Sequence, residues 1–344
     1  MSTLDVTERQ REGALDLFRA LAVVLVVQNH LLNAALEYST EGHGTALLHL
    51  SNIVAPVRMP GLMMVAGYFA AGSLAKRGAA VFVSTKMASI AYPAFVWSIV
   101  MGFLYWLEGG DDKSLVLFIH RAIGPGHLWF LWYLVAFFAA APLILGRRSL
   151  AIAFAIGTGL FVLLVPQHDK SGFVMMLHFF IVGNLLPRSF TAALRPLAFS
   201  PVALLSAAVL AIVPAALNWG LPLDWATARY ALQAYTLIPI LILFCVRMDE
   251  ARLASMAKSI GGHSLEVYIL HVPIIIVILR FMEPLNVGFY GAAGVLIASL
   301  IPLLVVAVFA SKRWGRWLFK PPQFLLAKLP SKATPDADAG QQDQ

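Results

Sequence analysis

The sequence predicts an all-α polytopic membrane protein with about ten transmembrane helices. Two observations lead to this class. Hydrophobic residues make up 60% of the 344 residues and only 12% are charged, whereas an average soluble domain has about 25% charged residues. The apolar residues also gather in long uncharged runs, and the mean hydropathy is +0.78. Runs of this kind are typical of helices that cross a bilayer.

Ten apolar stretches are long enough, or nearly so, to span the hydrocarbon core: 14–36, 49–75, 88–107, 127–145, 150–166, 172–187, 201–218, 229–246, 263–282 and 289–310. The first follows a polar segment, 1–13, and has no small-residue cleavage site, which favours a retained helix over a secretory signal. The fifth and sixth stretches are short for a bilayer about 30 Å thick. The predicted organisation is a cytoplasmic segment (1–13), a membrane domain (14–320) and a polar, disordered cytoplasmic tail (321–344).

The basic residues indicate how the chain is oriented. With the N-terminus inside, most of the 25 lysines and arginines fall on cytoplasmic segments, and the outer segments hold only Lys113, Arg121, Lys170, Arg229 and Arg280. The positive-inside rule therefore predicts that both termini are cytoplasmic. This distribution also explains the net charge of +7, so nucleic acid is not an expected partner. The single cysteine, Cys245, excludes an internal disulfide and a cysteine-based zinc site, and it fits a small core residue better than a catalytic thiol.

Several polar side chains fall inside the apolar stretches, where an arginine at the helix centre costs about 2.5–3.5 kcal/mol. Such residues usually face a protein-lined interior and mark a functional site. By depth, most of them are expected to converge on one outward-opening cavity, with Arg19 apart on the cytoplasmic side. The candidates are Asp16, Arg19, Asn29, His30, Asn33, Arg58, His127, His178, Glu266 and His271, with Trp129 beside His127.

The stretch FRALAVVLVVQNH places Arg19 and His30 eleven residues apart. On an α-helix this step is about three turns plus roughly 20° and a rise of about 16 Å, so the two side chains share one face at different depths. Simpler interpretations stay open. Arg19 is placed to reach the inner headgroups or to pair with Asp16. His30 and His271 each fit a satisfied interior histidine, and His127 with Trp129 fits an interfacial belt.

Six segments resemble, in order, the motifs of the integral-membrane acyltransferase family 3. ALDLFRALAVVLVVQNHLLNAALEY is similar to its first helix, with an arginine, ten residues and a histidine. VRMPGLMMVAGYFAAG resembles the second-helix pattern, and TKMASIAYP the basic residue and proline of the third. GHLWFLWYLVAFF, HFFIVGNLLP and SIGGHSLEVYILHVPI resemble later segments, so that the likeness runs from about residue 14 to residue 275.

The Arg-Met-Pro and His-Leu-Trp-Phe-Leu forms are most similar to the subgroup that contains glucan biosynthesis protein C. The resemblance to this subgroup implies addition of succinyl groups to periplasmic glucans. The sequence departs from the family pattern at three places. Gly61 to Met64 replace the usual aromatic pair, Ala66-Gly67 replaces Ser-Gly, and Lys86 stands where an arginine is usual. These changes bear on the acyl group and the acceptor more than on the reaction class.

The family resemblance implies an enzyme of the bacterial inner membrane that moves an acyl group, acetyl or succinyl, from a cytoplasmic donor to a hydroxyl of an extracytoplasmic glycan. Acyl-CoA is the expected donor and co-substrate, and no cofactor or metal is expected. Besides the donor, the carbohydrate acceptor and the lipid bilayer, glycan-synthesis proteins are expected partners.

If the protein catalyses this reaction, the chemistry of the membrane-embedded polar residues suggests a role for each. Arg19 is expected to hold the donor phosphates. His30 is expected to be the general base or a covalent acyl carrier, with His271 as its orienting partner or a second acid/base. Arg58 is expected to stabilise the oxyanion or bind an acidic acyl group. The expected substrate-binding residues are Asn33, His127, Trp129, His178 and Glu266, the last of which is placed to pair with either histidine.

Three other functions remain open at this stage. Ten helices with interior histidines and arginines also suit an ion-coupled transporter, although no inverted repeat and no matching pair of broken helices is found. An acyl-group translocator would move the acyl group without completing the transfer. A non-catalytic scaffold is the third alternative.

Overall fold

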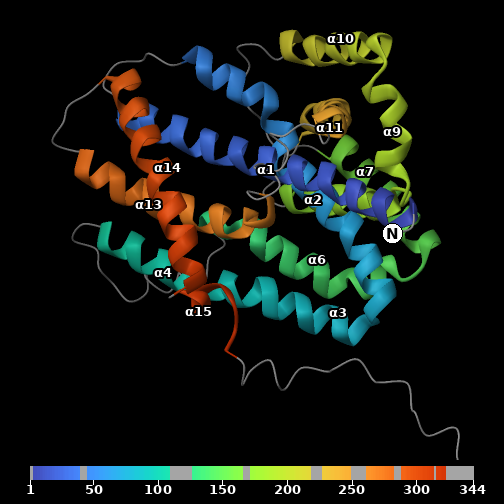
Figure 1. Cartoon of the computed structure of the whole chain (residues 1–344), viewed down its shortest axis with the longest axis horizontal. Helices are drawn as coiled ribbons and strands as arrows, with labels where there is room; N and C mark the ends of the chain where they lie inside the picture. The colour runs from blue at the N-terminus through green and yellow to red at the C-terminus, as the bar shows by residue number, and fades with distance from the viewer. Residues whose placement is uncertain are drawn as a thin grey trace, which may run out of the picture.

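The computed structural model describes residues 3–38, 45–108, 126–165, 171–217, 227–248, 261–282, 288–313 and 315–322. Within these ranges the chain is helical and contains no strand. The elements, as labelled in Figure 1, are α1 (Thr3–Tyr38), α2 (Thr45–Arg77), α3 (Ala79–Lys86), η1 (Met87–Ala91), α4 (Tyr92–Glu108), η2 (Gly126–Leu128), α6 (Trp129–Leu145), α7 (Arg148–Leu164), α8 (Ser171–Leu185), α9 (Phe190–Ala198), α10 (Pro201–Leu217), α11 (Ala228–Met248), α13 (Ser264–Met282), α14 (Phe289–Arg313) and α15 (Arg316–Phe319).

In the described part of the chain, six helices are long and apolar enough to cross a membrane: Gly13–Glu37, Ala46–Arg77, Ala79–Leu107, Ala228–Met248, Ser264–Met282 and Phe289–Phe309. A seventh candidate is the pair formed by Gly172–Leu185 and Phe190–Ala198, which is bent by 87°. The structure therefore supports a multi-pass membrane protein.

Every one of the ten predicted apolar stretches contains a helix: six of these are the long helices, one belongs to the bent pair, and the other three are shorter. The longest of the three have 17 residues, or about 25 Å of helix, which is less than a bilayer core of about 30 Å. The count of ten spans and the orientation of the termini thus stay predictions. The predicted tail, 321–344, lies almost wholly outside the described residues.

Helices α1 and α13 lie side by side and run in the same direction (Figure 1). Arg19 of α1 bonds to Ser264 at the start of α13, and His30 of α1 contacts His271 further along it. This arrangement places one face of α13 against the face of α1 that carries Arg19 and His30.

Two glycines allow α2 and α8 to cross at very close range. A Cβ atom on Gly67 would lie 1.8 Å from the carbonyl oxygen of Phe180, and one on Gly183 would lie 1.8 Å from that of Met64. Small residues at helix crossings are the usual means by which membrane helices approach closely. The contact fixes α2, which carries Arg58 and part of the cavity wall described below.

The third membrane stretch is longer than the sequence predicts and is not a uniform α-helix. It begins at Ala79, after Gly78 with its positive φ of 76°, and continues through the π-helical turn η1 into α4. Such turns occur frequently at functional sites. Because the helix extends back to Ala79, Lys86 lies inside this candidate span.

Candidate functional site

A cavity of about 480 Å³ lies between α1, α2, α6, α13 and the α3–η1 segment. Most of its wall is apolar and is formed by leucine, isoleucine, valine and phenylalanine side chains. Its polar side chains are Asp16, Arg19, Lys86, Ser89, Ser264 and Tyr268. The volume lies within the range of small-molecule sites, which combine apolar walls with a few polar groups.

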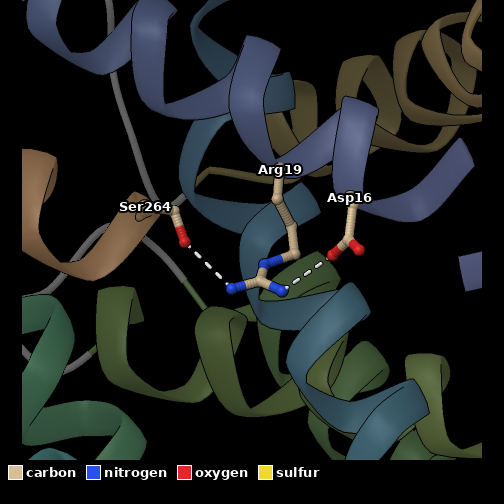
Figure 2. A network of polar contacts seen from close by, with 3 residues as sticks. All are labelled: Asp16, Arg19 and Ser264. Carbon is tan, nitrogen blue, oxygen red and sulfur yellow. Dashed lines mark hydrogen bonds and ion pairs between the residues drawn. The ribbon is translucent and has the colours of Figure 1, made fainter. Parts of the chain in front are cut away.

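Arg19 is held in this cavity by residues of two helices (Figure 2). Its Nη1 donates to Oδ1 of Asp16 at 3.0 Å, and its Nη2 donates to Oγ of Ser264 at 2.9 Å. Gly261 packs against α1 at the same place, since a Cβ atom there would lie 2.3 Å from the carbonyl oxygen of Asp16. A guanidinium has five N–H donors, so Arg19 is fixed in position and keeps donors for a ligand.

Lys86 adds a second positive charge to the cavity. Its Nζ lies 4.6 Å from the centroid of the Phe138 ring, a cation–π arrangement. Lys86 and Arg19 line the same cavity. Among the described residues Arg19 pairs with Asp16 and Lys86 has no ion-pair partner. Two cations against one carboxylate leave the cavity positive, which favours an anionic ligand.

The sequence places Lys86 in a family pattern, but it does not predict a role for Lys86 in the site. The apolar residues AAVFV, which precede the polar segment STK, are the signal that the helix extends back to Ala79 and that Lys86 lies within it. Ser264 and Tyr268 fall within another motif, but the sequence does not predict that they line a cavity. Their importance depends on which face of α13 meets α1, which the sequence of one helix does not reveal.

His30 and His271 form a second group of polar side chains. Their ring centroids are 5.1 Å apart, with the planes inclined at 51°. His271 is 1% exposed, and its Nδ1 lies 3.2 Å from the carbonyl oxygen of Val267. In a neutral ring, donation from Nδ1 to a carbonyl leaves Nε2 as the acceptor. His30 is half-buried.

Arg58 lies beside this histidine pair and is 5% exposed. Its Nη2 donates to the Ser51 hydroxyl at 2.7 Å and also to the Ser51 carbonyl. The Ser51 hydroxyl in turn lies 3.3 Å from Oδ1 of Asn29, the neighbour of His30. The positive charge of Arg58 acts on His30, and Nε of Arg58 has no hydrogen-bond partner among the described residues. Arg58 thus brings a buried cation, with a donor to spare, to the histidine pair.

The other predicted substrate-binding residues have different surroundings. His178 is 7% exposed, and its two ring nitrogens contact Thr158 of α7 and the Tyr235 hydroxyl of α11. The rings of Trp129 and Tyr133 meet edge to face at 5.1 Å.

Asn33 is exposed, and its Nδ2 donates to the Asn29 carbonyl one turn earlier on α1. Glu266 is half-buried in the first turn of α13. The side chain of His127 lies outside the described part of the structure.

The structure therefore arranges the predicted residues in two groups. Arg19 lies in the positive cavity with Lys86, whereas His30, His271 and Arg58 lie together beyond it. The cavity described here surrounds Arg19 and not the histidines, and the outward-opening cavity expected for most of the other polar residues stays a prediction. Tyr268 joins the groups, since it lines the cavity and its ring lies 5.8 Å from that of His271.

The structure is a bundle of apolar helices that holds a positive cavity and a histidine pair. These side chains suit an enzyme that transfers a chemical group within a membrane. The family model described as an acyltransferase domain matches residues 12–312, which include both groups. The chain therefore belongs to the acyltransferase family 3 and is an acyltransferase with transmembrane helices. Searches of curated proteins and of solved structures each found no match.

Proposed function

We propose that the protein transfers an acyl group, acetyl or succinyl, from acyl-CoA to a hydroxyl of a glycan across the bacterial inner membrane. The observation that carries this proposal is the alignment of a positive cavity with a histidine pair along α1 and α13. The resemblance to the subgroup of glucan biosynthesis protein C makes succinyl-CoA and a periplasmic glucan the first donor and acceptor to test.

The cavity suits the donor in charge and in shape. CoA carries several phosphate charges, which arginine and lysine bind through charge-assisted hydrogen bonds. Its pantetheine arm is long and thin, and the apolar wall beyond Arg19 offers it a path. The rise from Arg19 to His30 along α1 is about 16 Å. An acyl-CoA whose phosphates are held near Arg19 would therefore extend its thioester toward the histidine pair.

The histidine pair supplies the chemistry of the transfer. In the general-base route, His30 takes the proton of the acceptor hydroxyl while the hydroxyl oxygen attacks the thioester carbonyl. The carbon–sulfur bond then breaks, and the thiolate takes the proton from the imidazolium, which yields an ester and free CoA. His271, fixed by the Val267 carbonyl, orients His30, and the Arg58 charge stabilises the oxyanion.

The covalent route differs in one intermediate. A nitrogen of His30 attacks the thioester first, CoA leaves, and the acceptor hydroxyl then takes the acyl group from the histidine. Incubation of the protein with donor alone separates the two routes, because only the covalent route gives an acylated His30 that mass spectrometry detects.

The full chain, purified and reconstituted in lipid vesicles, tests the proposed function. With radiolabelled succinyl-CoA or acetyl-CoA on one side and glucan oligosaccharides on the other, we expect ester on the glycan that depends on the donor. Uptake of a solute without any donor would instead indicate an ion-coupled transporter. Acyl groups that cross the membrane but stay off the glycan would indicate a translocator.

Variants of the two cavity cations connect this activity to the site. Loss of a charged hydrogen bond costs about 1.5–3 kcal/mol, so Arg19→Ala and Lys86→Met are each expected to weaken CoA binding by about tenfold or more. Arg19→Lys should weaken it less, and Lys86→Arg should keep it. The matched control is Lys76→Met, because Lys76 is exposed at the end of α2 and does not line the cavity. Unchanged CoA affinity in both Arg19→Ala and Lys86→Met would contradict the assignment of the cavity to the donor.

A further inference from the structure

The donor cavity and the histidine pair are separate, although α1 and α13 contribute to both. On α13, Ser264 and Tyr268 line the cavity, and neither His30 nor His271 is among its lining residues. The proposed reaction requires the thioester carbon to reach the histidines. An acyl group held in the cavity must therefore pass the side chains that lie between the cavity and the histidine pair.

Tyr268 lies between the donor cavity and the histidine pair. It is 4% exposed and borders the cavity on one side. On another side its ring lies 5.8 Å from the His271 ring, which in turn lies 5.1 Å from the His30 ring. The order is thus cavity, Tyr268, His271, His30.

The position of Tyr268 is fixed by its own helix and by α6. Ser264, Tyr268 and His271 follow one another at four and three residues, so they lie on one face of α13. The Phe130 ring of α6, which also lines the cavity, lies 5.4 Å from that of Tyr268 at an inclination of 54°. A large ring held between a phenylalanine and a histidine leaves little room for a bulky group beside it.

We infer that Tyr268 is a specificity-determining residue that limits the size of the acyl group reaching His30 from the donor cavity. The inference rests on the proposed function, because it presupposes acyl-CoA in the cavity. Tyr268 takes no part in bond making or breaking. Short acyl groups pass its ring, whereas longer ones are held back in the cavity with their thioester away from the histidines.

The test compares transfer rates from acetyl-, propionyl-, butyryl- and hexanoyl-CoA for the wild-type protein and Tyr268 variants in vesicles. In Tyr268→Ala, we expect the ratio of the hexanoyl to the acetyl rate to rise by about tenfold or more, since steric discrimination of one methylene is worth about 10–200-fold. Tyr268→Phe keeps the ring and should keep the wild-type ratio. Tyr268→Trp should lower kcat for propionyl- and butyryl-CoA and leave the affinity for CoA unchanged.

A matched control and a folding check keep the outcomes distinct. Phe173→Ala removes a half-buried ring that contacts Tyr133 and does not line the cavity, and it should leave the hexanoyl-to-acetyl ratio unchanged. If Tyr268→Ala does not fold, the Tyr268→Phe and Tyr268→Trp variants decide the matter alone.

Two negative results have different meanings. A wild-type protein that transfers no acyl group from any CoA ester would overturn the proposed function. A wild-type protein that transfers acyl groups, with the same chain-length preference as Tyr268→Ala or Tyr268→Trp, would overturn only the role of Tyr268.

Discussion

The two histidines of the site differ in how firmly they are held. His271 is fully enclosed, and a backbone carbonyl fixes its Nδ1. His30 is half-buried and contacts His271 through its ring. A firmly held ring suits a positioning role, and the less enclosed ring suits contact with the reacting groups.

Substitution of each histidine tests this division of roles. We expect His30→Ala to lower kcat by about 10²–10⁴-fold, the usual contribution of an acid–base group, with little change in CoA affinity. His271→Ala should lower kcat less, and the double variant should be no slower than His30→Ala, because residues that act as a unit are non-additive. Rates are measured with saturating donor on variants that still bind CoA. Multiplicative losses in the double variant would show that the two rings act independently.

At the level of residues, the sequence predicts which side chains of the candidate site stand out, but it does not predict their partners on other helices. Arg19, His30, Arg58 and His271 stand out because a charged or titratable side chain is costly within an apolar run. The surroundings of His178 were not predictable, since they are set by Thr158 and Tyr235 on two other helices. Partners contributed by distant segments leave no mark in the local pattern.

At the scale of elements, the glycine contact between α2 and α8 determines how closely these helices approach. Each of Gly67 and Gly183 faces a backbone carbonyl of the other helix, with no space for a Cβ atom. A backbone atom does not move aside as the end of a flexible side chain does. Any larger residue must push the helices apart and so displace α2, which carries Arg58 and part of the cavity wall.

Thermal unfolding of glycine variants in detergent measures this effect. Gly67→Ala and Gly183→Ala are each expected to destabilise the protein by about 1–3 kcal/mol, the usual range for overpacking, and so to lower Tm. Gly294→Ala is the matched control, because a Cβ atom there meets nothing within 4 Å. It should leave Tm unchanged or raise it slightly, since alanine is the better helix former. Equal Tm values for all three variants would show that the crossing tolerates a wider spacing.

The sequence predicted the existence of the elements better than their ends. The third stretch was predicted to begin at residue 88, because Lys86 and the polar residues around it lower the local hydropathy, yet the helix begins at Ala79. The helix α9 was not predicted at all. It bends away from α8 by 87°, and its Arg195 and Pro196 break the apolar run by which spans are recognised.

At the scale of the whole molecule, the number of spans and the location of the termini depend on each other. Two cytoplasmic termini require an even number of crossings. The six long helices satisfy this condition, as do ten spans, whereas seven would place the termini on opposite sides. The described helices establish six to seven candidate spans by length and composition, so an experiment on the termini also restricts the count.

Labelling of introduced cysteines tests the predicted orientation. The natural Cys245 is buried and should stay unlabelled in the folded protein. We expect Ser331→Cys, in the C-terminal tail, to resist a membrane-impermeant maleimide added outside intact spheroplasts, and Asp112→Cys, in a predicted outer loop, to react. Lysis should make Ser331→Cys reactive. Labelling of Ser331→Cys before lysis would overturn the predicted cytoplasmic C-terminus.

The pairing of α1 with α13 has a consequence for synthesis. The first helix leaves the ribosome long before the helix that carries Ser264, Tyr268 and His271. A nascent or prematurely terminated chain lacking α13 has His30 without its partner and Arg19 without the Ser264 contact. Such fragments would lack the packing of α1 against α13 that the proposed acyl transfer requires. Activity should therefore arise only near the end of translation.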